Sequence, residues 1–121
     1  MNSGLTGQSA RELVDAYMHA TGRPWTQPIG FAYALSEVAI DILKRAENLD
    51  DSASLLEAVK ATDYSFVVGP LKWIGEPVKN VTKTPLVAGH WRKMDNIFNL
   101  VVCENKTAFE IPVQAKLNLL S

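Results

Sequence analysis

The chain has 121 residues, of which 47% are hydrophobic and 21% are charged, and these fractions exclude a disordered polymer or a fibrous repeat. Twelve lysine and arginine residues oppose thirteen aspartate and glutamate residues, so the net charge of −1 offers no basic excess for nucleic acid. The single cysteine, Cys103, excludes an internal disulfide framework and a multi-thiolate metal site. The length suits one domain.

The amino-terminal residues do not form the basic region and apolar run of a signal peptide, and no stretch approaches the roughly 20 apolar residues of a membrane span. Taken literally, these absences indicate a cytoplasmic protein. The alternative is that the chain is a piece whose targeting signal lies upstream. Residues 1–8 carry two glycines and no periodic pattern, so we expect a loop or a disordered start.

A capping box of Ser9 and Glu12 predicts the start of a first helix, because each residue can satisfy a backbone amide of the other. Apolar residues follow at helical spacing as far as Ala20. Gly22 and Pro24 then predict the end of this short amphipathic helix.

The strongest helical pattern runs from Phe31 to Ala46. We expect its buried side to be one wide apolar stripe, formed by Phe31, Ala34, Leu35, Val38, Ala39, Ile42, Leu43 and Ala46. The opposite face is expected to carry the charged residues Glu37, Asp41, Lys44 and Arg45, with both cations in the last turn, where they oppose the helix dipole favourably.

A third helix follows residues 48–51 and should end near residues 61–62. Its cap is Ser54, in a second capping box with Glu57, or else Asp51 or Ser52, and the pattern leaves these alternatives open. Its buried side is expected to hold Leu55, Leu56 and Val59.

After Asp63 the pattern changes to short strands. Residues 64–68 are β-branched and aromatic, Gly69 and Pro70 punctuate them, and residues 77–85 indicate a surface loop. Two strands at 86–91 and 97–104, joined by residues 92–96, predict a hairpin, and residues 106–121 are expected to be irregular. Three helices followed by short strands predict an α+β fold for the chain alone.

Catalytic and metal signatures are weak. His19 and His90 lack the spacing of a metal motif, so we expect no metal and no cofactor. Cys103 and His90 paired across the hairpin would form a nucleophile and a base, which makes a small Cys/His hydrolase a remote alternative. A cysteine beside Glu104 in a strand is more typical of a small apolar residue. We therefore expect no enzyme.

One segment carries a physical argument for ligand binding. Residues 25–31 lead into the long helix without an obvious cap, and free amides at a helix start attract anions such as carboxylates. Trp25 and Phe31 would wall a small pocket there. The competing interpretation is that Thr26 or Gln27 caps the helix and both aromatic residues belong to the core.

Three groups of segments occur in a characteristic order and spacing. They are Gly30–Leu35 with Leu49–Asp51, then Leu56–Tyr64 with Val67–Trp73, then Pro85–Lys93. Together they resemble the C-terminal third of the type I periplasmic substrate-binding proteins of ABC transporters, and most of all the branched-chain amino-acid (Leu/Ile/Val-binding) family. The similarity runs from about Leu5 to the end of the chain.

The resemblance implies a two-lobed α/β fold that closes over its ligand, with the strand at 97–104 crossing the hinge. It implies that residues 1–121 form one C-terminal segment of such a domain, non-catalytic, in an importer of amino acids or related small carboxylates that works with an ABC permease. It implies a periplasmic or extracellular location. It also places the candidate ligand-binding residues near the cleft rim, namely Trp25, Gln27, Pro28 and Phe31.

Most of both lobes is absent from this sequence, so its helices should expose apolar faces that would otherwise pack on a sheet. We therefore expect a homo-oligomer that buries the face carrying Leu35, Val38 and Ile42. The alternative function is a self-associating structural or interaction module, derived from the same fold, that binds no ligand of its own. Neither nucleic acid nor membrane is an expected partner.

Overall fold

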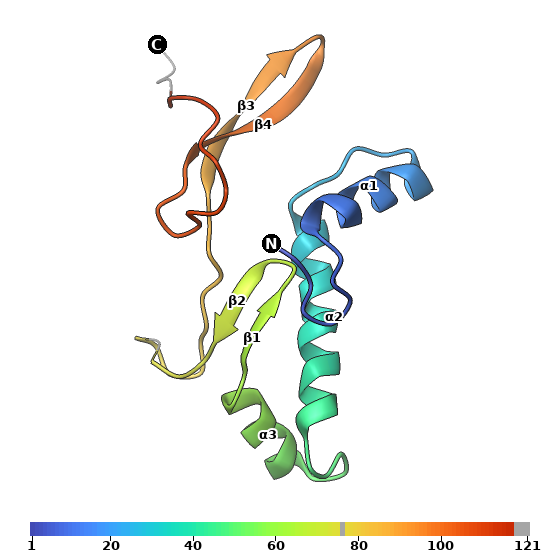
Figure 1. Ribbon diagram of the computed structural model, residues 1–121, viewed down its shortest axis with the longest axis vertical. Coiled ribbons are helices and arrows are strands. Elements are labelled where there is room, and N and C mark those ends of the chain that lie inside the picture. Colours follow the sequence, from blue (N-terminus) through green and yellow to red (C-terminus); the bar gives the residue numbers. More distant parts are fainter. Residues whose placement is uncertain (76, 118–121) are drawn as a thin grey trace. The chain divides into compact units, whose positions relative to one another are not determined.

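The computed structural model describes residues 1–75 and 77–117. The chain divides into two compact units, residues 1–84 and residues 85–121, and each is described by itself. Within the described residues, three helices precede two antiparallel hairpins of two strands each (Figure 1). This order confirms the predicted α+β fold class.

The first helix, α1 (Ala10–Thr21), begins where the capping box predicts. The Glu12 amide donates to Ser9 Oγ at 3.2 Å, and the Ser9 amide donates to Glu12 Oε2 at 2.8 Å. Gly22 ends the helix in the left-handed conformation, with φ of 65°, which glycine adopts at little cost. Both termini of α1 are therefore as predicted.

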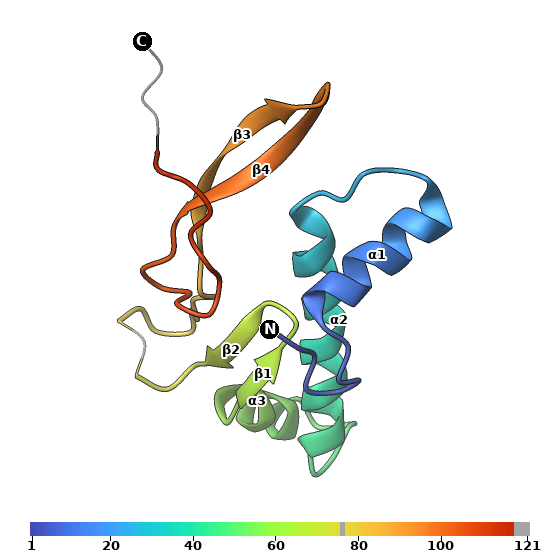
Figure 2. The ribbon, with the colours of Figure 1, turned by 45° about the horizontal axis from the view of Figure 1, so that its top comes forward.

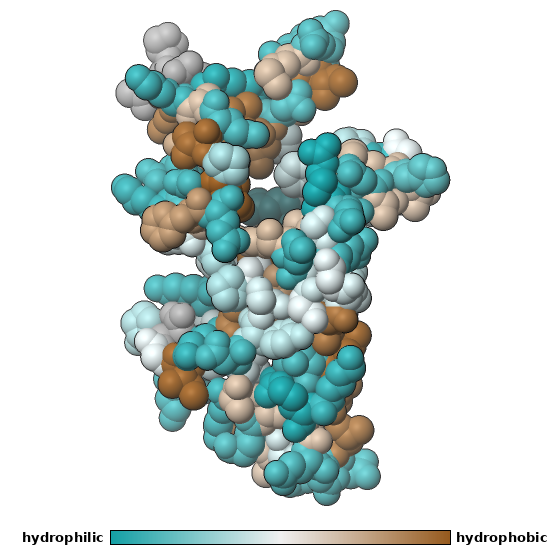
Figure 3. Space-filling model, in the orientation of Figure 1, coloured by the Kyte–Doolittle hydropathy of each residue, from teal (hydrophilic) through white to brown (hydrophobic). Residues whose placement is uncertain are grey.

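The long helix, α2 (Pro28–Arg45), begins three residues earlier than expected, and its predicted buried side is wrong. Of the eight apolar stripe residues only Ala34 is buried, and Leu35 is 73% exposed. Glu37 and Asp41, expected in solvent, are only 3% and 5% exposed. Hydrophobic side chains consequently lie on the outside of α2 (Figure 3).

The third helix, α3 (Ser52–Lys60), is capped by Asp51, whose Oδ1 accepts the Ala53 amide at 3.0 Å. This selects one of the three caps left open by the sequence. The helix buries Ala58, whereas Leu56, expected inside, is half exposed. Both ribbon views place α3 beside the C-terminal half of α2 (Figures 1 and 2).

The first hairpin joins β1 (Asp63–Phe66) to β2 (Gly69–Lys72), with Phe66 opposite Gly69. Its two-residue turn is therefore 67–68, whereas the sequence placed the break at residues 69–70. The turn is buried rather than solvated, since Val67 is only 3% exposed. It therefore lacks the polar residues by which a turn is recognised in a sequence.

The core of the first unit lies between α2, α3 and this hairpin. Its buried apolar residues are Ala34, Ala58, Phe66, Val67 and Leu71. The loop of residues 2–9 packs on β1, because the Gly4 amide donates to the Ser65 carbonyl at 3.0 Å and the Tyr64 hydroxyl donates to the Gly4 carbonyl at 2.7 Å.

The second unit contains β3 (Ala88–Met94) and β4 (Ile97–Glu104). The predicted hairpin is present, but β3 extends to Met94 and the link is only Asp95–Asn96. Both residues have positive φ, 50° and 64°, as a type I′ turn requires. Residues 105–117 have no helix or strand, as expected, and the rest of the predicted irregular tail lies outside the described residues.

None of the helices in the described ranges combines the length and the apolar character that a bilayer span requires.

Candidate functional site

The four residues predicted to bind ligand lie at the entry to α2. Gln27 occupies the N-cap position, and no side-chain hydrogen bond from the described residues caps the helix there. Thr26 contributes its backbone instead, because its carbonyl accepts the Ile29 amide at 3.1 Å. The uncapped start inferred from the sequence is therefore confirmed, and the alternative of a Thr26 or Gln27 side-chain cap is wrong.

This entry offers an anion fewer amides than an uncapped helix normally does. Pro28 stands at the first helical position and has no N–H, and the Ile29 amide is already paired. Among the first three helical positions, 28–30, that leaves the Gly30 N–H. An anion at this position would need side-chain donors as well, and Gln27 is the exposed polar side chain beside it.

The two aromatic residues of the segment are not core residues. Trp25 is 37% exposed and Phe31 is 39% exposed, and they flank the exposed Gln27 and Pro28. There is room beside the helix start, since a Cβ built on Gly30 would meet only Val68 Cγ1, at 3.8 Å. The four residues thus form an exposed aromatic-walled segment, and ligand binding to it stays a prediction.

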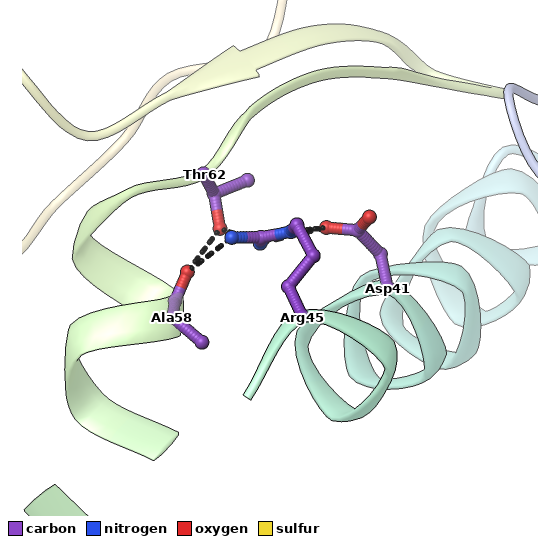
Figure 4. Close-up of polar contacts among 4 residues, drawn as sticks. All are labelled: Asp41, Arg45, Ala58 and Thr62. Carbon is purple, nitrogen blue, oxygen red and sulfur yellow. Dashed lines mark hydrogen bonds and ion pairs between the residues drawn. The ribbon is translucent and has the colours of Figure 1, made fainter. Parts of the chain in front are cut away.

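A polar network that the sequence did not suggest connects α2 to α3. The Arg45 guanidinium donates from Nε and Nη2 to Asp41 Oδ2, at 2.9 and 2.7 Å (Figure 4). It also donates to the Ala58 carbonyl and to Thr62 Oγ1, each at 2.8 Å. The Ala58 carbonyl belongs to the last turns of α3, and Thr62 follows directly after that helix. Because the Arg45 guanidinium of α2 donates to both, this network fixes α3 on α2.

A cavity of about 530 Å³ lies beside this network, between the end of α2 and the start of α3. Its lining carries one cation and three carboxylates and consists of Arg45, Glu47, Asp51, Ala53, Ser54, Glu57, Ala58 and Ala61. Several of these groups are already engaged: Arg45 in the network, Asp51 in the cap, and Glu57 with Lys60 Nζ at 2.7 Å.

Glu37 is the second polar residue that α2 buries. Its Oε2 accepts the Val67 amide at 2.9 Å, which satisfies a turn N–H that has no strand partner. Its Oε1 is buried without a hydrogen-bond partner among the described residues. The buried carboxylate therefore joins α2 to the β1–β2 turn, and this requirement explains why the polar face of α2 points inward.

His90 and Cys103 both lie on the β3–β4 hairpin, but their hydrogen bonds go elsewhere. His90 Nε2 accepts the Arg92 Nε–H at 2.6 Å, and Cys103 Sγ donates to the Val101 carbonyl at 3.5 Å. His90 thus uses on Arg92 the lone pair that a general base would need. In the described part of the chain, no group of three or more His, Cys, Asp or Glu residues is arranged to hold a metal ion.

Comparison of this chain with protein-family models, with curated proteins and with solved structures finds no match.

Proposed function

We propose that the chain is the C-terminal segment of a two-lobed solute-binding protein of an ABC importer, non-catalytic, which takes part in binding an amino acid or a related small carboxylate. The observation that carries the proposal is the uncovered apolar face of α2. Leu35 and Leu43, about two turns apart on this face, are 73% and 49% exposed, and Ala39 between them is exposed as well. Such a face belongs to a helix that packs on another layer.

The polar side of α2 supports the same interpretation. Glu37, Asp41 and Arg45 form the contacts with α3 and the β1–β2 turn, so the first unit already occupies that side. The apolar side is then free to pack against a sheet supplied by the remainder of the lobe. A helix with an occupied polar side and an open apolar side fits the interior of a larger protein better than the surface of a small one.

The entry to α2 supplies the ligand-binding part of the proposal. Trp25 and Phe31 offer apolar walls, and Gln27 offers an amide between them. Because the Gly30 N–H is the amide left at positions 28–30, this segment would contribute one edge of a carboxylate site and other segments would supply the rest. The chain alone is therefore expected to bind amino acids weakly or not at all.

The test combines gene structure with calorimetry. The reading frame should continue upstream into a segment encoding the remaining lobes and a signal peptide. That segment, co-expressed with this chain, should bind one amino acid or aromatic acid of a panel, and binding should be lost when the chain is omitted. An upstream sequence without such lobes, or tight one-to-one binding by the chain alone, would overturn the proposal.

Two matched variants test directly whether the exposed apolar face of α2 is a packing surface. Leu35→Lys places a charge on the α2 face and should prevent assembly of the co-expressed complex. Leu49→Lys, at an exposed leucine in the loop before α3, should leave assembly intact. Equal assembly of both variants would show that the α2 face is not the packing surface.

A further inference from the structure

The outer edge of β3 carries a row of unpaired backbone groups. The tight turn makes Met94 and Ile97 a hydrogen-bonded pair, so His90, Arg92 and Met94 direct their amides and carbonyls to β4. Gly89, Trp91 and Lys93 alternate with them and direct theirs away from β4. Among the described residues, no hydrogen bond reaches the backbone of these three on that side.

The opposite edge of the hairpin is partly occupied. Val102, which faces Gly89 in the register, donates its amide to Gln114 Oε1 at 2.9 Å. Its carbonyl accepts the Gln114 amide at 2.8 Å. The Val102 backbone groups point away from β3, so those of its partner Gly89 must point away from β4. This independently confirms that Gly89 belongs to the outward-facing set of β3. The described tail therefore covers part of the β4 edge. It also contacts β3 through the Lys116 carbonyl, which accepts the Arg92 Nη2–H at 2.8 Å, but within the described residues it makes no hydrogen bond to the β3 backbone.

A two-stranded sheet of this kind is marginal without a further strand. The hairpin also displays large apolar side chains, because Trp91 is 60% exposed and Phe98, diagonal to it on the same face, is 63% exposed. An open edge beside exposed aromatic residues is a template for pairing with another strand. The remaining question is which strand the edge fits.

We propose that the β3 edge pairs antiparallel with β3 of a second copy of this chain, on a two-fold axis at Trp91. The sequence of β3 is self-complementary in this register. Trp91 faces its own copy, and the charged Lys93 faces Gly89, which has no side chain. On the other face Arg92 lies opposite His90, a donor and an acceptor that already bond within one chain.

In this register Met94 faces Ala88 at the ends, and no rung sets two full charges opposite each other. Each of the three outward residues can exchange two hydrogen bonds with its counterpart. The result is a four-stranded sheet with the order β4–β3–β3–β4. This pairing uses residues 88–94 only, so it is independent of the solute-binding proposal and of the α2 face.

Site-specific cross-linking of the full chain tests the register. In a Cys103→Ser background, Trp91→Cys puts two thiols on the two-fold axis, about 5.5 Å apart between Cα atoms and within disulfide reach. The matched control, Lys93→Cys, puts them about 13 Å apart, beyond that reach. We expect the disulfide-linked dimer to form at least about tenfold faster with the cysteine at position 91 than with the cysteine at position 93. Equal rates, or none at either position, would overturn the proposal.

Light scattering over a concentration series tests the edge itself without a new cysteine. Lys93→Pro removes an outward amide that the hairpin does not use, and should weaken the dimer about tenfold or more. Phe98→Pro makes the same change on the same rung at the β4 edge and should leave the dimer intact. Circular dichroism and amide resonances establish that both variants fold. A monomer at all concentrations, or dimerisation abolished by Leu35→Lys but not by Lys93→Pro, would contradict this assignment.

Discussion

Arg45 shows how much one side chain can do in a unit with a small core. Its four hydrogen bonds reach Asp41 on its own helix and two acceptors beyond it, and the Asp41 side chain is only 8% exposed. Removing one partner of such a pair leaves the other charge without compensation in a poorly solvated position. The Arg45 side chain is one-third exposed, so solvent reduces this cost.

We expect Arg45→Met to lower the free energy of unfolding by about 2 kcal/mol, because the buried Asp41 carboxylate loses its cation and Thr62 Oγ1 loses its donor. The Ala58 carbonyl keeps the Thr62 hydroxyl as a donor, at 3.2 Å. Arg11→Met is the matched control. It breaks another i,i+4 pair with an aspartate, Asp15, but the two side chains are 85% and 52% exposed. It should change stability by less than about 0.5 kcal/mol. Urea titrations followed by helical circular dichroism measure both, and equal effects would contradict the structural role of the network.

Glu12 gives a pH dependence to the start of α1. Hydrogen bonds from the Ser9 amide, and then from the Ser9 hydroxyl, lower the pKa of Glu12 below its ordinary value. A lowered pKa in the folded state means that the ionised carboxylate stabilises α1. This contribution is fully present above the ordinary glutamate pKa of about 4.3 and is lost as pH falls through the lowered pKa.

Ser9→Ala should therefore raise the pKa of Glu12 only part of the way to its ordinary value, because the larger contribution, from the backbone amide, remains. Ser9→Thr keeps the hydroxyl and should leave the pKa lowered. Carboxyl carbon chemical shifts followed from pH 6 to pH 2 report both values. An unchanged titration in Ser9→Ala would show that the hydroxyl does not stabilise the ionised Glu12 carboxylate.

At the scale of elements, the β3–β4 turn is the clearest case of local sequence deciding structure. Asp95 and Asn96 both adopt positive φ, which asparagine tolerates and β-branched residues do not. We expect Asn96→Gly to increase, and Asn96→Val to decrease, the amide-exchange protection of Val101, the latter by about tenfold. Asn99→Val, in the exposed part of β4, should leave it unchanged. Equal protection in all three variants would contradict the I′ turn.

The elements themselves were largely predictable, and their packing was not. The Ser9 capping box and Gly22 act on their own neighbours, so the ends of α1 follow from sequence alone. The inward face of α2 does not, because it depends on the Val67 amide, 30 residues away, which needs the Glu37 carboxylate. An amphipathic pattern identifies two faces but does not say which one a small unit will cover.

In the candidate site, too, local features could be inferred from the sequence better than contacts between elements. The bare start of α2 was only one of two interpretations that the sequence allowed, since Thr26 could also have capped the helix. The structure decides between them, because no side chain of the described residues caps α2. The Asp41–Arg45 network was missed. The signal available for it was an aspartate and an arginine at i,i+4 spacing, which is equally typical of a solvent-exposed pair.

At the scale of the whole molecule, the described residues bury few apolar groups. Seven hydrophobic residues are buried, three of them alanines, whereas nineteen large hydrophobic residues are exposed. The chain exposes 8943 Å², and two separate compact bodies of its two lengths would together expose only about 7,700 Å². The excess agrees with the proposal that further protein surface covers parts of both units.

Because the two units have separate contacts, residues 77–84, the irregular end of the first unit, should be the first site of proteolysis. Lys79 and Lys83 are exposed and lie outside helices and strands. Brief trypsin treatment should cut there first and release an amino-terminal fragment that keeps its helical circular dichroism. Mass spectrometry identifies the cuts. First cleavage at Lys44 or Lys60, inside helices, would mean that unit 1–84 does not fold on its own.

The contacts that hold α2 in place have a kinetic consequence. Arg45 reaches Thr62 across 17 residues, and Glu37 reaches Val67 across 30, so each closes a loop of modest length. Closing such loops costs little chain entropy, and a low mean sequence separation favours rapid folding. We therefore expect residues 37–67 to form structure early in folding, before this segment meets whatever covers its apolar side.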